Sequence, residues 1–132
     1  MSPAYIQSNA AILMQCLNPG DQVALWNAEN PLTGAKSMAV ALSPPRFGEN
    51  TKYFSIQLVF SAAPGAFTYD IEASNTDVDA DYVKIGTSIT AATSPSTLSA
   101  VADNIQTTMK YIRLIATLQN ANGVNVTATA SR

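Results

Sequence analysis

The fold is decided at residues 53–61, which read YFSIQLVFS. Every second residue is apolar, and the only aliphatic residue in the opposite register is Val59. The residues that share the apolar register are Phe54, Ile56, Leu58 and Phe60. Successive side chains of a strand point to opposite faces of a sheet. This period of two therefore predicts a half-buried strand with one polar face.

A second alternating run follows at residues 67–74, FTYDIEAS. Residues 62–65, AAPG, separate it from the first run and contain the Pro and Gly that are typical of a turn. We therefore expect the two runs to pair as neighbouring antiparallel strands.

The last third of the chain repeats this arrangement. Residues 111–118 and 124–130 both alternate, and the intervening residues 120–123 read NANG. An Asn-Gly pair between two alternating runs is the strongest short-range signal of a hairpin, because both residues accept a positive φ. The sequence predicts a terminal hairpin whose tight end is Asn122-Gly123.

Three further runs are weaker strand candidates, at residues 23–27, 36–43 and 82–89. With these, the whole chain is expected to form a single domain. The expected fold is an all-β antiparallel sandwich or jelly roll of seven to eight strands with minimal helix. One or two helical turns are expected at residues 96–106. Residues 1–18 are interpreted as an N-terminal arm, an edge strand or a short helix.

Charge and composition exclude several function classes. The 132 residues are 47% hydrophobic and 12% charged, with a net charge of −2 and scattered basic residues. No basic stripe is present to neutralise a nucleic-acid backbone. No run of about 18 or more apolar residues is present to span a bilayer. Residues 10–17 lack the basic leader of a signal peptide, so we expect synthesis and folding in a cytoplasm without nucleic-acid or membrane partners.

The residue types needed for catalysis are scarce. The chain has no His and one Cys, Cys16, which is expected to be a buried and inert thiol within the apolar run 12–17. No glycine-rich phosphate loop is present. Asp70 and Glu72 share one strand face, which is expected to be exposed and solvated. We therefore expect no enzyme, no catalytic residue and no cofactor.

An acidic segment at residues 75–81 reads NTDVDAD and has the D-x-D-x-D spacing that opens a calcium loop. An EF-hand needs Gly at the sixth position and Glu at the twelfth, where this chain has Tyr82 and Ser88. We expect a polar turn, in which Asn75 and the aspartates bond their own backbone, and no metal. The alternative is a calcium site outside the EF-hand pattern.

Candidate interface residues come from the first 26 positions. Trp26 fits neither register of its strand, which leaves it as a core residue or as an anchor for a partner. Tyr5, Ile6 and the apolar run that follows form a segment able to order against another protein. The resulting candidate interface set is Tyr5, Ile6, Ile12, Leu13, Leu17 and Trp26.

Residues 53–132 resemble small structural proteins of tailed bacteriophages. The similarity rests on FSAAPG at residues 60–65, YDIE at residues 69–72, the Asp77-Val78-Asp79 turn, KYIRL at residues 110–114 and the terminal VTA at residues 126–128. It implies a β-sandwich found as a capsid decoration (cement) protein, a head fibre, or a tail or neck component.

The resemblance implies a virion location and, as partners, the major capsid protein or other virion proteins, with homo-oligomers expected. Capsid decoration is the leading expectation, and a tail, neck or fibre component is the alternative. KYIRL also resembles a late strand of carbohydrate-binding β-sandwich modules. That third alternative requires an exposed aromatic platform.

Overall fold

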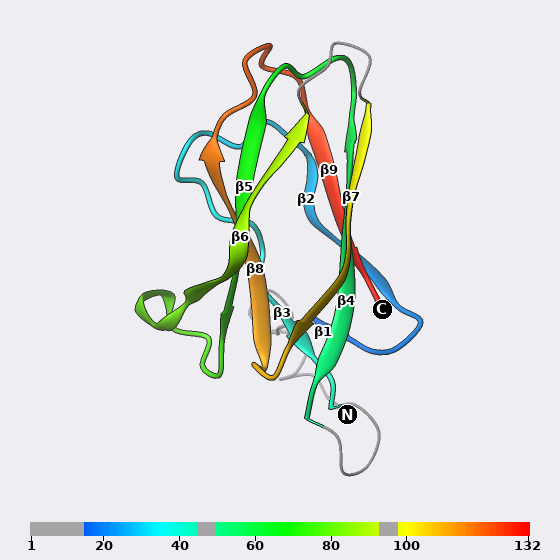
Figure 1. The fold of residues 1–132 in the computed structure, drawn as a ribbon, viewed down its shortest axis with the longest axis vertical. Helices are drawn as coiled ribbons and strands as arrows, with labels where there is room; N and C mark the ends of the chain where they lie inside the picture. Colours follow the sequence, from blue (N-terminus) through cyan, green and yellow to red (C-terminus); the bar gives the residue numbers. More distant parts are fainter. Residues whose placement is uncertain (1–14, 45–49, 93–97) are drawn as a thin grey trace, which may run out of the picture.

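The computed structural model describes residues 15–44, 50–92 and 98–132, which form two β-sheets packed face to face (Figure 1). The five-stranded sheet has the order β1-β3-β8-β5-β6, and the four-stranded sheet has the order β2-β9-β4-β7. The strands are β1 (Cys16–Leu17), β2 (Gln22–Glu29), β3 (Val40–Leu42), β4 (Lys52–Phe60), β5 (Phe67–Ser74), β6 (Val83–Ala92), β7 (Ser99–Thr107), β8 (Tyr111–Leu118) and β9 (Val126–Ser131). One 3-10 turn, η2 (Asp79–Asp81), lies between β5 and β6. The expected all-β sandwich with minimal helix is confirmed, with nine strands in the described residues.

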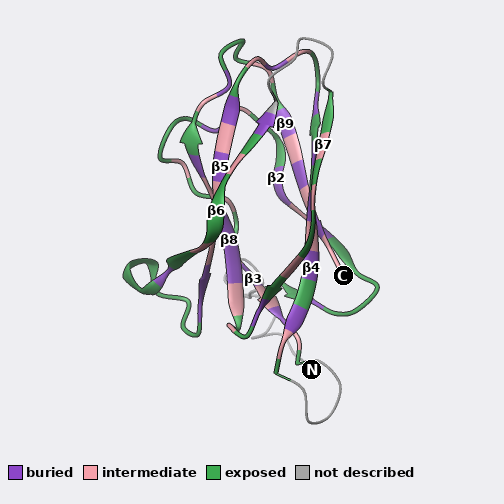
Figure 2. Ribbon diagram, viewed as in Figure 1, coloured by how far each residue is buried: buried purple, intermediate pink, exposed green. Residues whose placement is uncertain are grey.

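The core lies between the sheets and follows the period of two (Figure 2). In β4, the alternate residues from Lys52 to Phe60 are buried, and Val59 is exposed as expected. β5 and β9 alternate in the same way. Fully burying one large apolar side chain contributes about 1.5–3 kcal/mol, so these repeated inward positions supply the main stabilisation of the fold.

The expected antiparallel pair of residues 53–61 and 67–74 is wrong. β4 pairs with β7 and β9 in one sheet, whereas β5 pairs with β6 and β8 in the other. The connection after β4 crosses the sandwich and turns the apolar face of β5 toward that of β4. The two apolar faces are thereby buried against each other, whereas in a hairpin both would pack against the opposite sheet.

The expected terminal hairpin is also wrong, for the same reason. β8 and β9 belong to different sheets, so the residues between them form an arch across the sandwich. A tight turn is present one residue earlier than predicted, with Ala121 and Asn122 at its centre, because the Gly123 amide donates to the Asn120 carbonyl over 3.2 Å. The buried Asn120 side chain bonds both the backbone N–H and the carbonyl of Val124 and so holds the arch closed.

Gly123 has a φ of +64°, which a β-branched residue strongly disfavours. We expect Gly123→Val to lower the free energy of unfolding by about 1–2 kcal/mol through backbone strain. A clash contributes little, because a Cβ would lie 3.8 Å from the nearest atom. Thermal melts of this variant and of Gly123→Asn, which tolerates a positive φ, measure the effect. Equal melting temperatures for all three proteins would contradict it.

The region expected to be helical is a strand. β7 pairs antiparallel with β4 along most of its length, and residues 96–97 lie outside the described residues. Its period of two is interrupted by Asn104, which has a φ of +54° at a shift of register opposite Ser55. β7 is also an edge strand of partial exposure. The apolar alternation that reveals a strand is therefore weak in its sequence.

The N-terminal part of the chain enters the fold at an edge. β1 pairs in parallel with β3, and the Arg132 guanidinium donates to the carbonyls of Leu17 and Ser43 over 2.8 and 3.0 Å. The edge-strand interpretation thus applies to residues 16–17, while residues 1–14 lie outside the described residues. The candidates at residues 23–27, 36–43 and 82–89 correspond to β2, β3 and β6.

Candidate functional site

The outer face of the four-stranded sheet is almost free of charge. Its outward side chains alternate with buried ones and pair across neighbouring strands, as Gln57 does with Val101. The outward residues, which we call the charge-poor face, are Gln22, Ala24, Tyr53, Ser55, Gln57, Val59, Ser99, Val101, Asp103, Gln106, Thr127, Thr129 and Ser131. Asp103 is the only carboxylate among them, and it accepts a hydrogen bond from Ser55 on the same face.

Two valines form an apolar spot on this face. Val59 and Val101 are 48% and 60% exposed. Val59 pairs with Ser99, two residues before Val101, so the two valines are diagonal neighbours on adjacent strands. β4 lies between β9 and β7, which gives Val59 a rigid position, whereas Val101 lies on the edge.

The outer face of the five-stranded sheet is different, because it carries an ion network centred on Arg113. Arg113 Nε donates to Glu72 Oε1 over 2.8 Å, and Nη1 donates to Asp79 Oδ1 over 2.7 Å. The guanidinium also lies 3.9 Å from the centre of the Tyr82 ring. Lys36 donates to the same Asp79 carboxylate over 2.9 Å. Hydrogen bonds from Lys36 and Arg113 lower the pKa of Asp79 below its ordinary value.

The expectation that Asp70 and Glu72 are solvated is wrong. Their side chains are 14% and 16% exposed. Glu72 is bound by Arg113, and Asp70 lies 3.9 Å from the Lys84 ammonium. The period of two correctly puts both on the outward side of β5, but loops and long basic side chains cover that side.

The aspartates of the acidic segment accept hydrogen bonds from side chains and not, as expected, from their own backbone. Asp77 accepts from the Tyr82 hydroxyl over 2.8 Å, and Asp81 accepts from Thr76 over 2.6 Å. Burial and Asp77 raise the pKa of Tyr82. Among the described residues, no group of three or more His, Cys, Asp or Glu side chains is placed to hold a metal ion.

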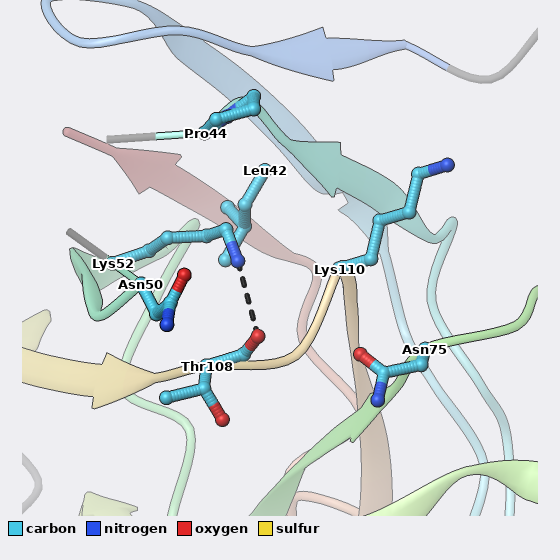
Figure 3. A pocket seen from close by; sticks show the side chains of 7 residues that line it. All are labelled: Leu42, Pro44, Asn50, Lys52, Asn75, Thr108 and Lys110. Carbon is cyan, nitrogen blue, oxygen red and sulfur yellow. Dashed lines mark hydrogen bonds between the residues drawn. The ribbon is translucent and has the colours of Figure 1, made fainter. Parts of the chain in front are cut away.

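A pocket of about 610 Å³ opens at the end of the sandwich where β4 and β8 begin (Figure 3). It is lined by Leu42, Pro44, Asn50, Lys52, Asn75, Thr108 and Lys110. The lining mixes two ammonium groups with amide, hydroxyl and apolar groups. Its described lining residues include no nucleophile paired with a base.

The structure removes two residues from the candidate interface set. Leu17 and Trp26 are 1% and 2% exposed and belong to the core. Trp26 lies at an irregularity in the pairing of β2 with β9, between Ala24 and Trp26, so that Leu25 and Trp26 are both buried. This bulge explains why Trp26 fits neither register. Tyr5, Ile6, Ile12 and Leu13 lie outside the described residues.

Cys16 is exposed, which corrects the expectation of a buried thiol. On the two-residue strand β1, Leu17 takes the inward position and Cys16 the outward one. The separation of charge between the two outer faces was missed by sequence reasoning. The polar outward residues of each strand were visible in the sequence, but their assignment to one sheet or the other was not.

Comparison with protein-family models and with curated protein sequences finds no match. Among solved structures, the chain is similar to the pre-peptidase C-terminal domain of a collagenase from Bacillus anthracis, with a TM-score of 0.42 and 10% identity. The match covers 90% of this chain and 93% of that chain. A likeness of this size carries no argument about function. In the described residues, no helix is long and apolar enough to cross a membrane. The class of protein that the fold defines is an all-β sandwich.

Proposed function

We propose that this protein is a virion structural protein of a tailed bacteriophage and not an enzyme. It binds the outside of the assembled head as a decoration (cement) protein and contacts the major capsid protein through the charge-poor face. The observation that carries this assignment is the nearly complete absence of charge from that face. Most of the other described charges lie on the opposite sheet or at the ends of the sandwich.

The chemistry of the charge-poor face suits contact with protein. The buried centres of protein interfaces are depleted of charged residues, because an unpaired charge loses its hydration without compensation. The hydroxyl and amide groups of this face exchange hydrogen bonds with water for hydrogen bonds with a partner. The exposed valines add apolar area near one end of the face.

The size of the face points to binding in many copies. Four strands about 4.8 Å apart and of these lengths present roughly 400–500 Å² in projection. Each partner in a typical stable complex buries about 800 Å². One copy therefore binds weakly through this face alone. A homo-oligomer that engages several capsid subunits at once gains affinity through effective concentration, and many copies together stabilise the shell.

The resemblance to phage structural proteins supports the same assignment from the sequence. It spans residues 53–132, which supply three of the four strands that carry the charge-poor face. The weak total charge of the chain fits a protein that is expected to have neither nucleic-acid nor membrane partners.

The test mixes purified protein with heads that lack it and measures occupancy by sedimentation and electron microscopy. We expect regular density at symmetry positions of the shell. A Val59→Lys/Val101→Lys variant should bind at least about tenfold more weakly, because it buries unpaired ammonium groups. The matched control is Val78→Lys/Val83→Lys, which places the same two charges at 53% and 52% exposed positions outside the face and should leave binding unchanged.

Wild-type binding by the double variant would overturn the role of this face. Density only at the tail or neck would move the protein to that alternative. Binding to neither, together with tight binding to glycans, would favour the carbohydrate-binding alternative. Tyr53 is the only aromatic residue of the charge-poor face and would then be the residue to replace.

A further inference from the structure

The described basic side chains fall into two groups. Lys36, Lys84 and Arg113 lie on the outer face of the five-stranded sheet, and each forms an ion pair with a carboxylate. The other three are Lys52, Lys110 and Arg132, which lie toward the open end of the sandwich, where β4 and β8 begin. No described carboxylate forms an ion pair with any of them. Three cations thus collect without a described counterion in a protein of net charge −2.

From this arrangement we infer that the pocket at the open end binds an oxyanion, either a carboxylate or a phosphate group. The inference is independent of the docking role proposed for the charge-poor face, because the pocket lies at the end of the sandwich and not on that face. The ligand is either a small free oxyanion or an Asp or Glu side chain of a protein partner, since both present the same chemistry.

Lys52 is the central group of this site. It occupies the inward register of β4, two residues before Phe54, and is mostly buried. Its Nζ donates to the Thr108 carbonyl over 3.1 Å (Figure 3). It also donates to the Met109 carbonyl over 3.2 Å. An ammonium group has three N–H donors, so one donor remains for a ligand. Burial and the nearby charge of Arg132 lower the pKa of Lys52, and a bound anion would offset both effects.

The other polar residues that line the pocket add further hydrogen-bond donors. Asn50, Asn75 and Thr108 offer amide and hydroxyl groups, and Lys110 adds a second ammonium group at the rim. Lys110 is exposed, and its Nζ lies 5.3 Å from the centre of the Tyr111 ring. A volume of about 610 Å³ falls within the range of small-molecule sites.

Titration calorimetry of the full chain at low ionic strength tests the inference with three probes: inorganic phosphate, citrate and a hexaglutamate peptide. We expect saturable binding of at least one probe, with a melting temperature several degrees higher at about a hundredfold excess over Kd. Lys110→Gln should weaken that binding at least about tenfold, because a charge-assisted hydrogen bond is lost. Lys84→Gln is the matched control, because it removes one ammonium group from the outer face of the five-stranded sheet. It should bind the probes as the wild type does.

Binding of phosphate or citrate that is lost in Lys110→Gln would identify a site for a free oxyanion. Binding of hexaglutamate alone, with the same loss, would identify a site for a partner's carboxylates. The inference is overturned if no probe binds saturably, or if Lys110→Gln binds as tightly as the wild type. It is equally overturned if Lys84→Gln weakens binding as much as Lys110→Gln, since the attraction would then reflect only net charge.

Discussion

Replacing Trp26 with alanine is expected to lower the free energy of unfolding by about 3–5 kcal/mol, as for other large aromatic residues deleted from a core. Trp26 is buried against Phe67, with ring centres 5.9 Å apart in an edge-to-face arrangement. Phe67 in turn contacts Phe60 and Tyr69. The deletion therefore opens a cavity in an aromatic cluster that joins the two sheets. Natural domains have about 5–15 kcal/mol of stability, so the variant should be close to unfolding.

Chemical denaturation of Trp26→Ala and of Tyr53→Ala measures this difference. Tyr53 is an exposed aromatic residue on the outward side of β4, and its replacement should change stability by less than about 0.5 kcal/mol. The role of Trp26 as a partner anchor predicts the reverse, with unchanged stability and lost binding. Equal stability of the two variants would contradict the core position of Trp26.

Replacing Arg113 with methionine is expected to lower the free energy of unfolding by about 2–3 kcal/mol, the second large effect. Removing one partner of a buried ion pair costs about 3–5 kcal/mol, and the figure here is smaller because Glu72 keeps some contact with water. Methionine retains apolar contact with the Tyr82 ring, so the loss reports mainly the charge. The variant leaves Glu72 without its cation and removes one of the two cations that hold the Asp79 carboxylate, the other being Lys36.

The control is Lys110→Met, because Lys110 is exposed and forms no ion pair with a described carboxylate, so its loss should cost less than about 0.5 kcal/mol. A pH series adds a second measurement. The pKa of Asp79 is lowered from its ordinary value of 3.8, so its contribution is present above about pH 4 and is lost as the pH falls through the lowered pKa. The difference between wild type and Arg113→Met should therefore shrink below pH 3.8. A difference that stays constant would show that the carboxylates do not contribute.

Local patterning in the sequence was sufficient for the strands that alternate clearly and for their buried sides. The alternation in residues 53–61, 67–74 and 111–118 identified the inward residues that the structure buries. It worked because the period of two is a property of a single strand and depends on no other part of the chain. The positive φ at Gly123 was predictable for the same reason, since an Asn-Gly turn is local.

Only the tertiary structure decided which strands pair and which outer face each one joins. A turn sequence shows that the chain reverses but not whether it returns within one sheet or crosses to the other, because both paths bury the same apolar residues. The arches after β4 and β8, the bulge at Trp26 and the strand at residues 99–107 all depend on partners distant in the sequence. The charge-poor face and the basic pocket depend on them too. Each collects side chains from several strands, and their proximity arises only when the two sheets close on each other.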